Sequence, residues 1–83
     1  MPKIFEWRGY KFFFYANEGE PLERCHIHIR KGGNEAKFWI EPEVDLASSY
    51  GFSGKELSEF RKIIEVQKEI IRSRWDDFFK HRS

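Results

Sequence analysis

The stretch RCHIHIRKGGNEAKFWIEP, residues 24–42, decides the fold of this chain. Apolar and polar residues alternate on either side of Gly32–Gly33, which predicts two antiparallel strands joined by a tight turn. Pairing the two halves about the glycines keeps apolar residues opposite one another, whereas a slip of one position would mix them with polar residues. The predicted pairs are Cys25–Ile40, Ile27–Phe38 and Ile29–Ala36 on one face, with His26–Trp39, His28–Lys37 and Arg30–Glu35 on the other.

A second hairpin is predicted upstream, where IFEW (residues 4–7) and YKFFFYA (residues 10–16) flank Arg8-Gly9. Setting the ends of the two segments opposite each other gathers five aromatic residues on one face. The opposite face carries a glutamate–lysine pair, and we expect this face to be the more solvent-exposed of the two. The aromatic face is Phe5, Trp7, Tyr10, Phe12 and Phe14, and the polar pair is Glu6 and Lys11.

The C-terminal third of the chain has the pattern of an amphipathic helix. Val44, Leu46 and Phe52 predict an irregular loop or short strand before it, and Ser53 with Glu56 forms a capping-box pattern at its start. The apolar positions that follow recur at mainly three- and four-residue spacings. They are Leu57, Phe60, Ile64, Ile71, Trp75 and Phe78, widened by Ile63, Val66, Ile70 and Phe79. The helix either reaches His81 as one rod or bends near Gln67 or Ser73.

These elements predict a single α+β domain over residues 1–83: a four-stranded, mainly antiparallel sheet of two hairpins, with a long C-terminal helix on its apolar face. A chain of 83 residues buries only a small core. Aromatic residues make up 18% of the chain, and we expect most of them to fill this small core. The alternative is that they form a stacking or docking surface.

Composition narrows the class of protein. Hydrophobic residues make up 40% and charged residues 35%, with a net charge of +1, so we expect a soluble globular chain. The lone cysteine, Cys25, excludes an internal disulfide and alternates with Ile27 on the apolar side, so we expect it to pack. No apolar run reaches the ~18 residues of a membrane span, and the start lacks the apolar core of a signal peptide. A cytoplasmic protein without a membrane association is expected.

The polar side of the central hairpin is the candidate functional face. Side chains two apart on a strand share a face, so the histidines project together with their cross-strand partners, and we expect this face to be open to solvent or to a partner. Its residues are His26, His28, Arg30, Glu35, Lys37 and Trp39.

Three interpretations of this face remain open. It is a polar surface that keeps the sheet soluble, a catalytic or RNA-contacting site, or a protein-docking surface. Acid–base chemistry fits the residues because histidine exchanges a proton near neutral pH. Arg30 and Lys37 would counter phosphate charge and Trp39 would stack on a base, and Glu35 is a further candidate binding residue. A metal site is not expected, since no third ligand is placed by spacing and Lys37 would repel a cation. No cofactor is expected.

The order of several segments resembles the small prokaryotic proteins of domain-of-unknown-function family 4160, and the likeness covers nearly the whole chain. The segments are MPKIF, FFFYANEGEP, CHIHIRKGG, AKFWIEP, YGFSGKEL and RWDDFF. Where the family usually has two prolines before the first histidine, this chain has Arg24 and Cys25.

The resemblance implies no settled activity, and it leaves open whether the chain is an enzyme. It implies a small protein partner encoded beside it, as in toxin–antitoxin pairs, docked on the polar sheet face or the long helix. On the family motif, His26 and His28 are the first candidates for activity. We therefore expect a toxin–antitoxin-type component acting on RNA or translation through this face. The alternative is a non-catalytic adaptor using the same face or the helix. The sequence leaves the oligomeric state open.

Overall fold

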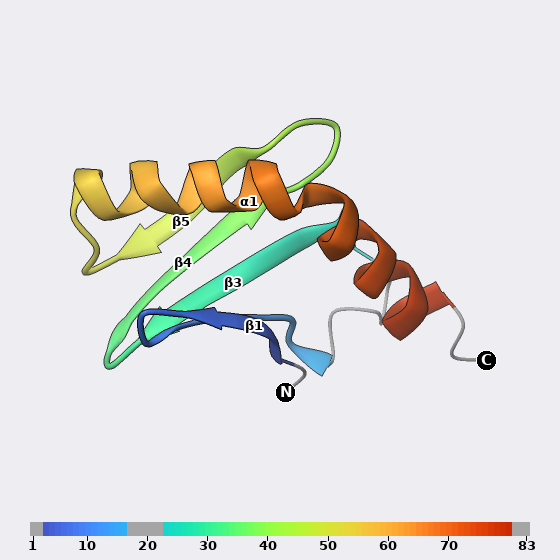
Figure 1. Ribbon diagram of the computed structural model, residues 1–83, viewed down its shortest axis with the longest axis horizontal. Coiled ribbons are helices and arrows are strands. Elements are labelled where there is room, and N and C mark those ends of the chain that lie inside the picture. Colours follow the sequence, from blue (N-terminus) through green and yellow to red (C-terminus); the bar gives the residue numbers. More distant parts are fainter. Residues whose placement is uncertain (1–2, 17–22, 81–83) are drawn as a thin grey trace.

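The computed structural model describes residues 3–16 and 23–80. Five strands form one antiparallel sheet in sequential order, and a long helix runs across one face of it (Figure 1). The elements are β1 (Lys3–Trp7), β2 (Tyr10–Phe13), β3 (His26–Lys31), β4 (Asn34–Trp39), β5 (Asp45–Tyr50), α1 (Gly54–Trp75) and a closing π-helical turn, η2 (Asp76–Lys80).

Both predicted hairpins are present in the predicted register. In β1–β2, Trp7 faces Tyr10, and in β3–β4, His28 faces Lys37. The turns are tight because residues with positive φ stand in them, including Gly9 at +83° and Gly32 at +60°, which glycine adopts without strain.

The prediction of four strands is wrong, because β5 adds a fifth beside β4. Its sequence, DLASSY, is polar, and only Leu46 among its residues is partly buried. Lys37 faces Ser48 but Phe38 faces Leu46, so Ala47 is an extra residue that forms a β-bulge. The bulge breaks the period-two alternation of apolar and polar residues. The sequence of this segment therefore predicted a strand only weakly.

The helix begins where the capping pattern predicted. The Ser53 hydroxyl accepts from the Glu56 backbone N–H at 3.1 Å, and the Glu56 carboxylate accepts from the Ser53 N–H at 2.8 Å. The α-helix continues through Gln67 and Ser73, with a change of direction in its second half (Figure 1), and becomes a π-helical turn after Trp75. The predicted end of the helix at His81 lies outside the described residues.

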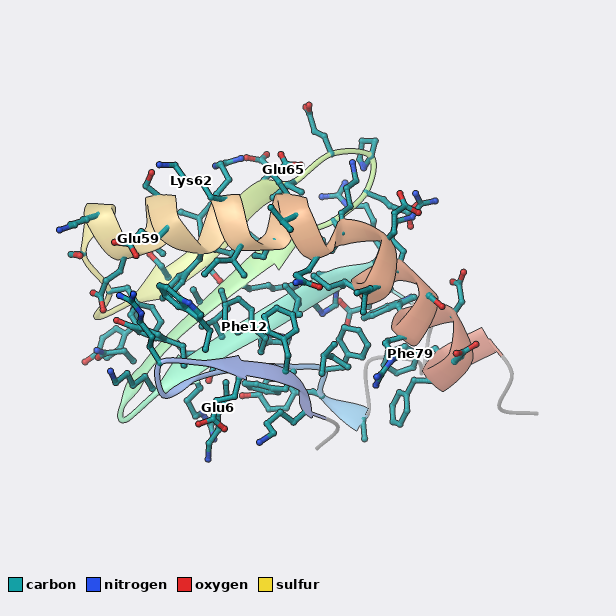
Figure 2. The ribbon with its side chains drawn as sticks, viewed as in Figure 1. Glu6, Phe12, Glu59, Lys62, Glu65 and Phe79 are labelled. Atoms are coloured by element: carbon teal, nitrogen blue, oxygen red, sulfur yellow. The ribbon has the colours of Figure 1, made fainter. Side chains whose placement is uncertain are left out.

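The main core lies between α1 and the sheet. Figure 2 shows Phe12 between α1 and the strands, and its side chain is fully buried. From the sheet the core includes Phe12, Phe14, Cys25, Ile27, Ile29, Ala36, Phe38 and Ile40, and from the helix Phe60, Ile64, Ile71 and Trp75. Cys25 packs here as predicted. The expected packing of Val66 and Ile70 is wrong, since they are 81% and 50% exposed.

The face of the sheet turned away from α1 is not uniformly exposed to solvent. Phe13 is fully buried although it lies outside the main core, and it faces His28 across β2 and β3. A second, smaller packed cluster therefore forms on the face predicted to be polar. Within the parts of the chain that the structure describes, no helix combines the length and apolar character needed to cross a bilayer.

Candidate histidine site on the sheet

The structure brings the six predicted site residues onto one face, because the β3–β4 register is the predicted one. We call this set the histidine face: His26, His28, Arg30, Glu35, Lys37 and Trp39. The expectation that its histidines are open to solvent is wrong. His26 is fully buried and His28 is only 7% exposed.

Aromatic rings cover His28. The Phe13 ring stacks on the imidazole of His28, with ring centroids 5.6 Å apart and an interplanar angle of 25°. The Tyr15 ring meets the imidazole edge-on at 4.5 Å. Phe13 is the last residue of β2 and Tyr15 comes two residues later, on the same side of the sheet. One short segment therefore covers His28.

His26 is held at the end of the sheet. Its Nδ1 lies 2.7 Å from the backbone oxygen of Arg24. Its ring is surrounded by the rings of His28 at 5.1 Å, Trp39 at 5.4 Å and Trp75 at 5.0 Å. Because the last β2–β3 pair is Phe13 with His28, β2 provides no paired residue beyond that point, and Trp75 from α1 packs against His26 there. His26 is therefore packed among aromatic rings at this end of the sheet.

Glu35 links the polar groups of the site. The Tyr15 hydroxyl lies 3.0 Å from both carboxylate oxygens, and Arg30 Nη2 lies 3.3 Å from Oε1. Arg30 Nη2 also donates to the Tyr15 hydroxyl at 3.1 Å. His28 Nδ1 stands 3.6 Å from Glu35 Oε2, so a protonated imidazole would be attracted to this carboxylate. A base held beside an oriented carboxylate is a common arrangement in acid–base sites.

The environment of Tyr15 keeps its hydroxyl protonated at neutral pH. Burial raises its pKa above the ordinary 10.0, and the hydrogen bond to Glu35 raises that pKa further. The nearby Arg30 opposes the shift with a smaller effect. Tyr15 therefore serves as a hydrogen-bond donor that fixes Glu35.

A shallow hollow of about 260 Å³ opens beside His28, between β4 and β5. Lys37 contributes its cation, and the bulged strand contributes hydroxyl groups and the ring of Tyr50, which is 75% exposed. The hollow is lined by His28, Glu35, Ala36, Lys37, Ser48, Ser49 and Tyr50. It therefore combines a titratable ring, a cation, hydroxyls and an exposed aromatic ring.

Trp39 is placed differently from the rest of the face. The Arg24 guanidinium lies 4.0 Å from the centre of its ring and Lys37 Nζ lies 4.4 Å from it. Lys37 also lies 3.7 Å from the Glu23 carboxylate. Cations already occupy positions over the Trp39 ring, so the freely accessible aromatic ring beside the hollow is Tyr50 and not Trp39.

The family profile described as "Domain of unknown function (DUF4160)" matches residues 9–76, which is most of the chain. The chain belongs to the DUF4160 family. The match includes the whole histidine face together with Phe13, Tyr15, β5 and all of α1. No curated protein and no solved structure matched the chain.

In this DUF4160 protein, sequence reasoning missed Phe13, Tyr15 and the contribution of β5. The first two had a usable signal: strict alternation places them on the same side of β2 as Lys11, opposite the predicted aromatic face. Ser48 and Tyr50 had none, because the bulge at Ala47 resets the alternation of β5. Among residues 3–16 and 23–80, no group of three or more histidine, cysteine, aspartate or glutamate side chains is placed to hold a metal ion.

Proposed function

We propose that this protein is a toxin–antitoxin-type component that acts on RNA, free or in the translation machinery, at the hollow beside His28. The observation that carries the proposal is the convergence of His28, Lys37 and Tyr50 on one hollow. A single-stranded RNA segment needs a cation for its phosphate, a ring for base stacking and, for cleavage, a group that moves a proton.

Each of these groups has a role in the proposal. The imidazole of His28 takes the proton of a ribose 2′-hydroxyl, whose oxygen attacks the adjacent phosphorus while the bond to the 5′ oxygen breaks. The imidazolium, directly or through a water, returns the proton to the departing 5′ oxygen. Lys37 neutralises phosphate charge, and Glu35, held by Tyr15 and Arg30, favours the transient imidazolium. The products would be a 2′,3′-cyclic phosphate and a 5′-hydroxyl end.

The second candidate is a non-catalytic adaptor that binds a small cognate protein. Two observations support it: His26 is fully buried, and the outer side of α1 exposes Val66 and Ile70. An adaptor would use its surface contacts and would not require proton transfer at His28.

Growth of a bacterial host on induction of the protein separates the two candidates. The RNA-acting component is expected to arrest growth, while His28→Gln, which remains polar, and Lys37→Ala are expected to relieve the arrest. Lys68→Ala removes a cation from α1 and serves as the matched control. Each variant is checked for folding by circular dichroism.

Sequencing of RNA ends from arrested cells should then reveal 5′-hydroxyl termini that are absent with His28→Gln. Binding to single-stranded RNA should weaken as salt rises, because phosphate contacts release counterions. Arrest that persists in His28→Gln, or an absence of arrest together with salt-insensitive partner binding, would refute the RNA proposal and leave the adaptor.

A further inference from the structure

Trp39 holds two cations at one end of the histidine face. The Arg24 guanidinium lies 4.0 Å from the centre of its ring, and Lys37 Nζ lies 4.4 Å from the same ring. The two charges are therefore separated by at most the sum of these distances, about 8.4 Å. Their attraction to the electron-rich ring offsets part of the repulsion between them. Two cations held this close form a site for an anion or for neighbouring anionic groups.

The backbone of Arg24 is fixed although its side chain is exposed. The Nδ1–H of His26 donates to the Arg24 carbonyl oxygen at 2.7 Å, and the oxygen of Cys25 accepts from the Ile40 N–H at 2.9 Å. Within residues 3–16 and 23–80, no carboxylate forms an ion pair with the Arg24 guanidinium. Arg24 therefore presents its charge to solvent at a defined place beside the sheet.

The two cations continue the hollow beside His28 along β4. Tyr50 stands opposite Glu35 at one end of this row, Lys37 follows in the middle, and Trp39 is at the other end on the same face. The four-residue step from Glu35 to Trp39 is about 13 Å long, which matches a few nucleotides of an extended single strand. We call this row the β4 track: Glu35 with Tyr50, Lys37 with His28, and Trp39 with Arg24.

We propose that Arg24 and Lys37 bind two successive phosphates of single-stranded RNA, with the strand lying along the β4 track. A base beside the phosphate at Lys37 stacks on Tyr50, and the next phosphate is held by Arg24. Trp39 is then a platform for the two cations and not a ring for a base. This inference rests on the proposed function, since it takes the hollow beside His28 as the place where RNA is held.

Glu23 opposes phosphate binding on the β4 track. Its carboxylate lies 3.7 Å from Lys37 Nζ, and it directly precedes Arg24 in the chain. A phosphate that approaches Lys37 competes with this carboxylate and is repelled by it. Glu23→Gln is therefore expected to strengthen RNA binding about threefold, which is opposite to the effect of removing a cation.

The salt dependence of RNA binding measures how many phosphates the chain holds. The probe is a fluorescein-labelled oligouridylate with methylated 2′-hydroxyls, which cannot be cleaved, and its anisotropy is followed from about 50 to 200 mM salt. Each phosphate contact with a single strand contributes about 0.7 to the slope of log affinity against log salt. Arg24→Gln and Lys37→Gln should each reduce the slope by about that amount. Lys62→Gln removes the same charge from the outer side of α1 (Figure 2) and should leave the slope unchanged.

Two variants of Trp39 test the platform. Trp39→Leu keeps an apolar side chain but offers no ring to the cations, so RNA binding should weaken about fivefold. Trp39→Phe keeps an aromatic ring and should retain most of the affinity. A thermal melt verifies the fold of every variant, and Arg24 and Glu23 are exposed, so their variants keep the test decisive if a Trp39 variant fails to fold.

The outcomes separate this inference from the proposed function. A wild-type chain that binds no RNA at low salt would overturn the proposed function and the β4 track with it. Binding that weakens in Lys37→Gln, while Arg24→Gln behaves like Lys62→Gln, would leave the proposed function standing and overturn the second phosphate position. Trp39→Leu that binds as tightly as the wild type would overturn the platform.

Discussion

Replacing Phe13 by alanine tests the least expected feature of the fold, the packed cluster on the sheet face turned away from the helix. Phe13 is fully buried and contacts the rings of Tyr15 and His28. Truncating a buried phenylalanine to alanine costs about 3 to 5 kcal/mol of unfolding free energy through lost burial and the cavity left behind. A domain of 83 residues has a total stability of about 4 to 12 kcal/mol, so the loss should be large.

The neighbouring residues on β2 supply matched controls. Phe12 is equally buried but belongs to the main core, so Phe12→Ala should cost a similar amount. Lys11 is exposed on the same side as Phe13, and Lys11→Ala should change stability by less than about 0.5 kcal/mol. Phe13→Leu, at about 1 kcal/mol, remains measurable if the alanine variant unfolds.

Urea unfolding followed by tryptophan fluorescence gives the unfolding free energies, with the slope of the transition checked for constancy. A second readout is specific to the site: because burial is the main cause of the raised pKa of Tyr15, Phe13→Ala should lower that pKa toward 10.0. A cost for Phe13→Ala close to that for Lys11→Ala, with an unchanged tyrosine titration, would refute the second cluster.

Three further predictions concern the start of α1 and the turn before it. The Tyr10 hydroxyl donates to Glu56 at 2.6 Å, and this hydrogen bond raises the pKa of Tyr10. That contribution to stability is complete below pH 10.0 and should be lost as pH rises through the raised pKa, so Tyr10→Phe should flatten the alkaline limb of the melting temperature against pH. The Ser53 amide lowers the pKa of Glu56, so the capping contribution should be present above pH 4.5 and lost in acid; Ser53→Ala should cost about 1 kcal/mol in urea unfolding. Gly51 has φ +88° and a Cβ there would collide with the Asn34 side chain, so Gly51→Ala should lower stability by at least about 1 kcal/mol, and a neutral result would contradict the turn geometry.

The sequence predicted the elements whose apolar pattern is strong. The hairpin registers and the burial of Ile64, Ile71 and Trp75 followed from periodicity, because each pattern had one arrangement that kept apolar residues together. The start of the helix followed from the capping-box residues Ser53 and Glu56. Strand β5 did not follow, because Ser48 and Ser49 carry no hydrophobic signal and the bulge at Ala47 removes the alternation.

Placement of the six candidate residues on one face was predictable, but their exposure was not. Alternation says which side of a strand a residue occupies, and not what covers that side. His28 is buried because Phe13 and Tyr15 reach over it from β2, and His26 because Trp75 arrives from a helix almost 50 residues later in the chain. Those contacts depend on where β2 ends and how far α1 extends, which single-strand patterns do not encode.

The histidine face and the core are consequently coupled in this protein. A small domain has little apolar area to spare, and here aromatic residues pack on both sides of β2: Phe12 toward the helix and Phe13 toward the histidines. The same ring that stabilises the sheet also fixes the orientation of His28 beside Glu35. A substitution that loosens the packing should therefore disturb the site as well, whereas Lys37 and Tyr50, at the hollow's margin, can change its chemistry without entering the core. Variants at these two residues will therefore separate the proposed RNA activity from stability most clearly, because their loss leaves Phe13, Tyr15 and His28 in place.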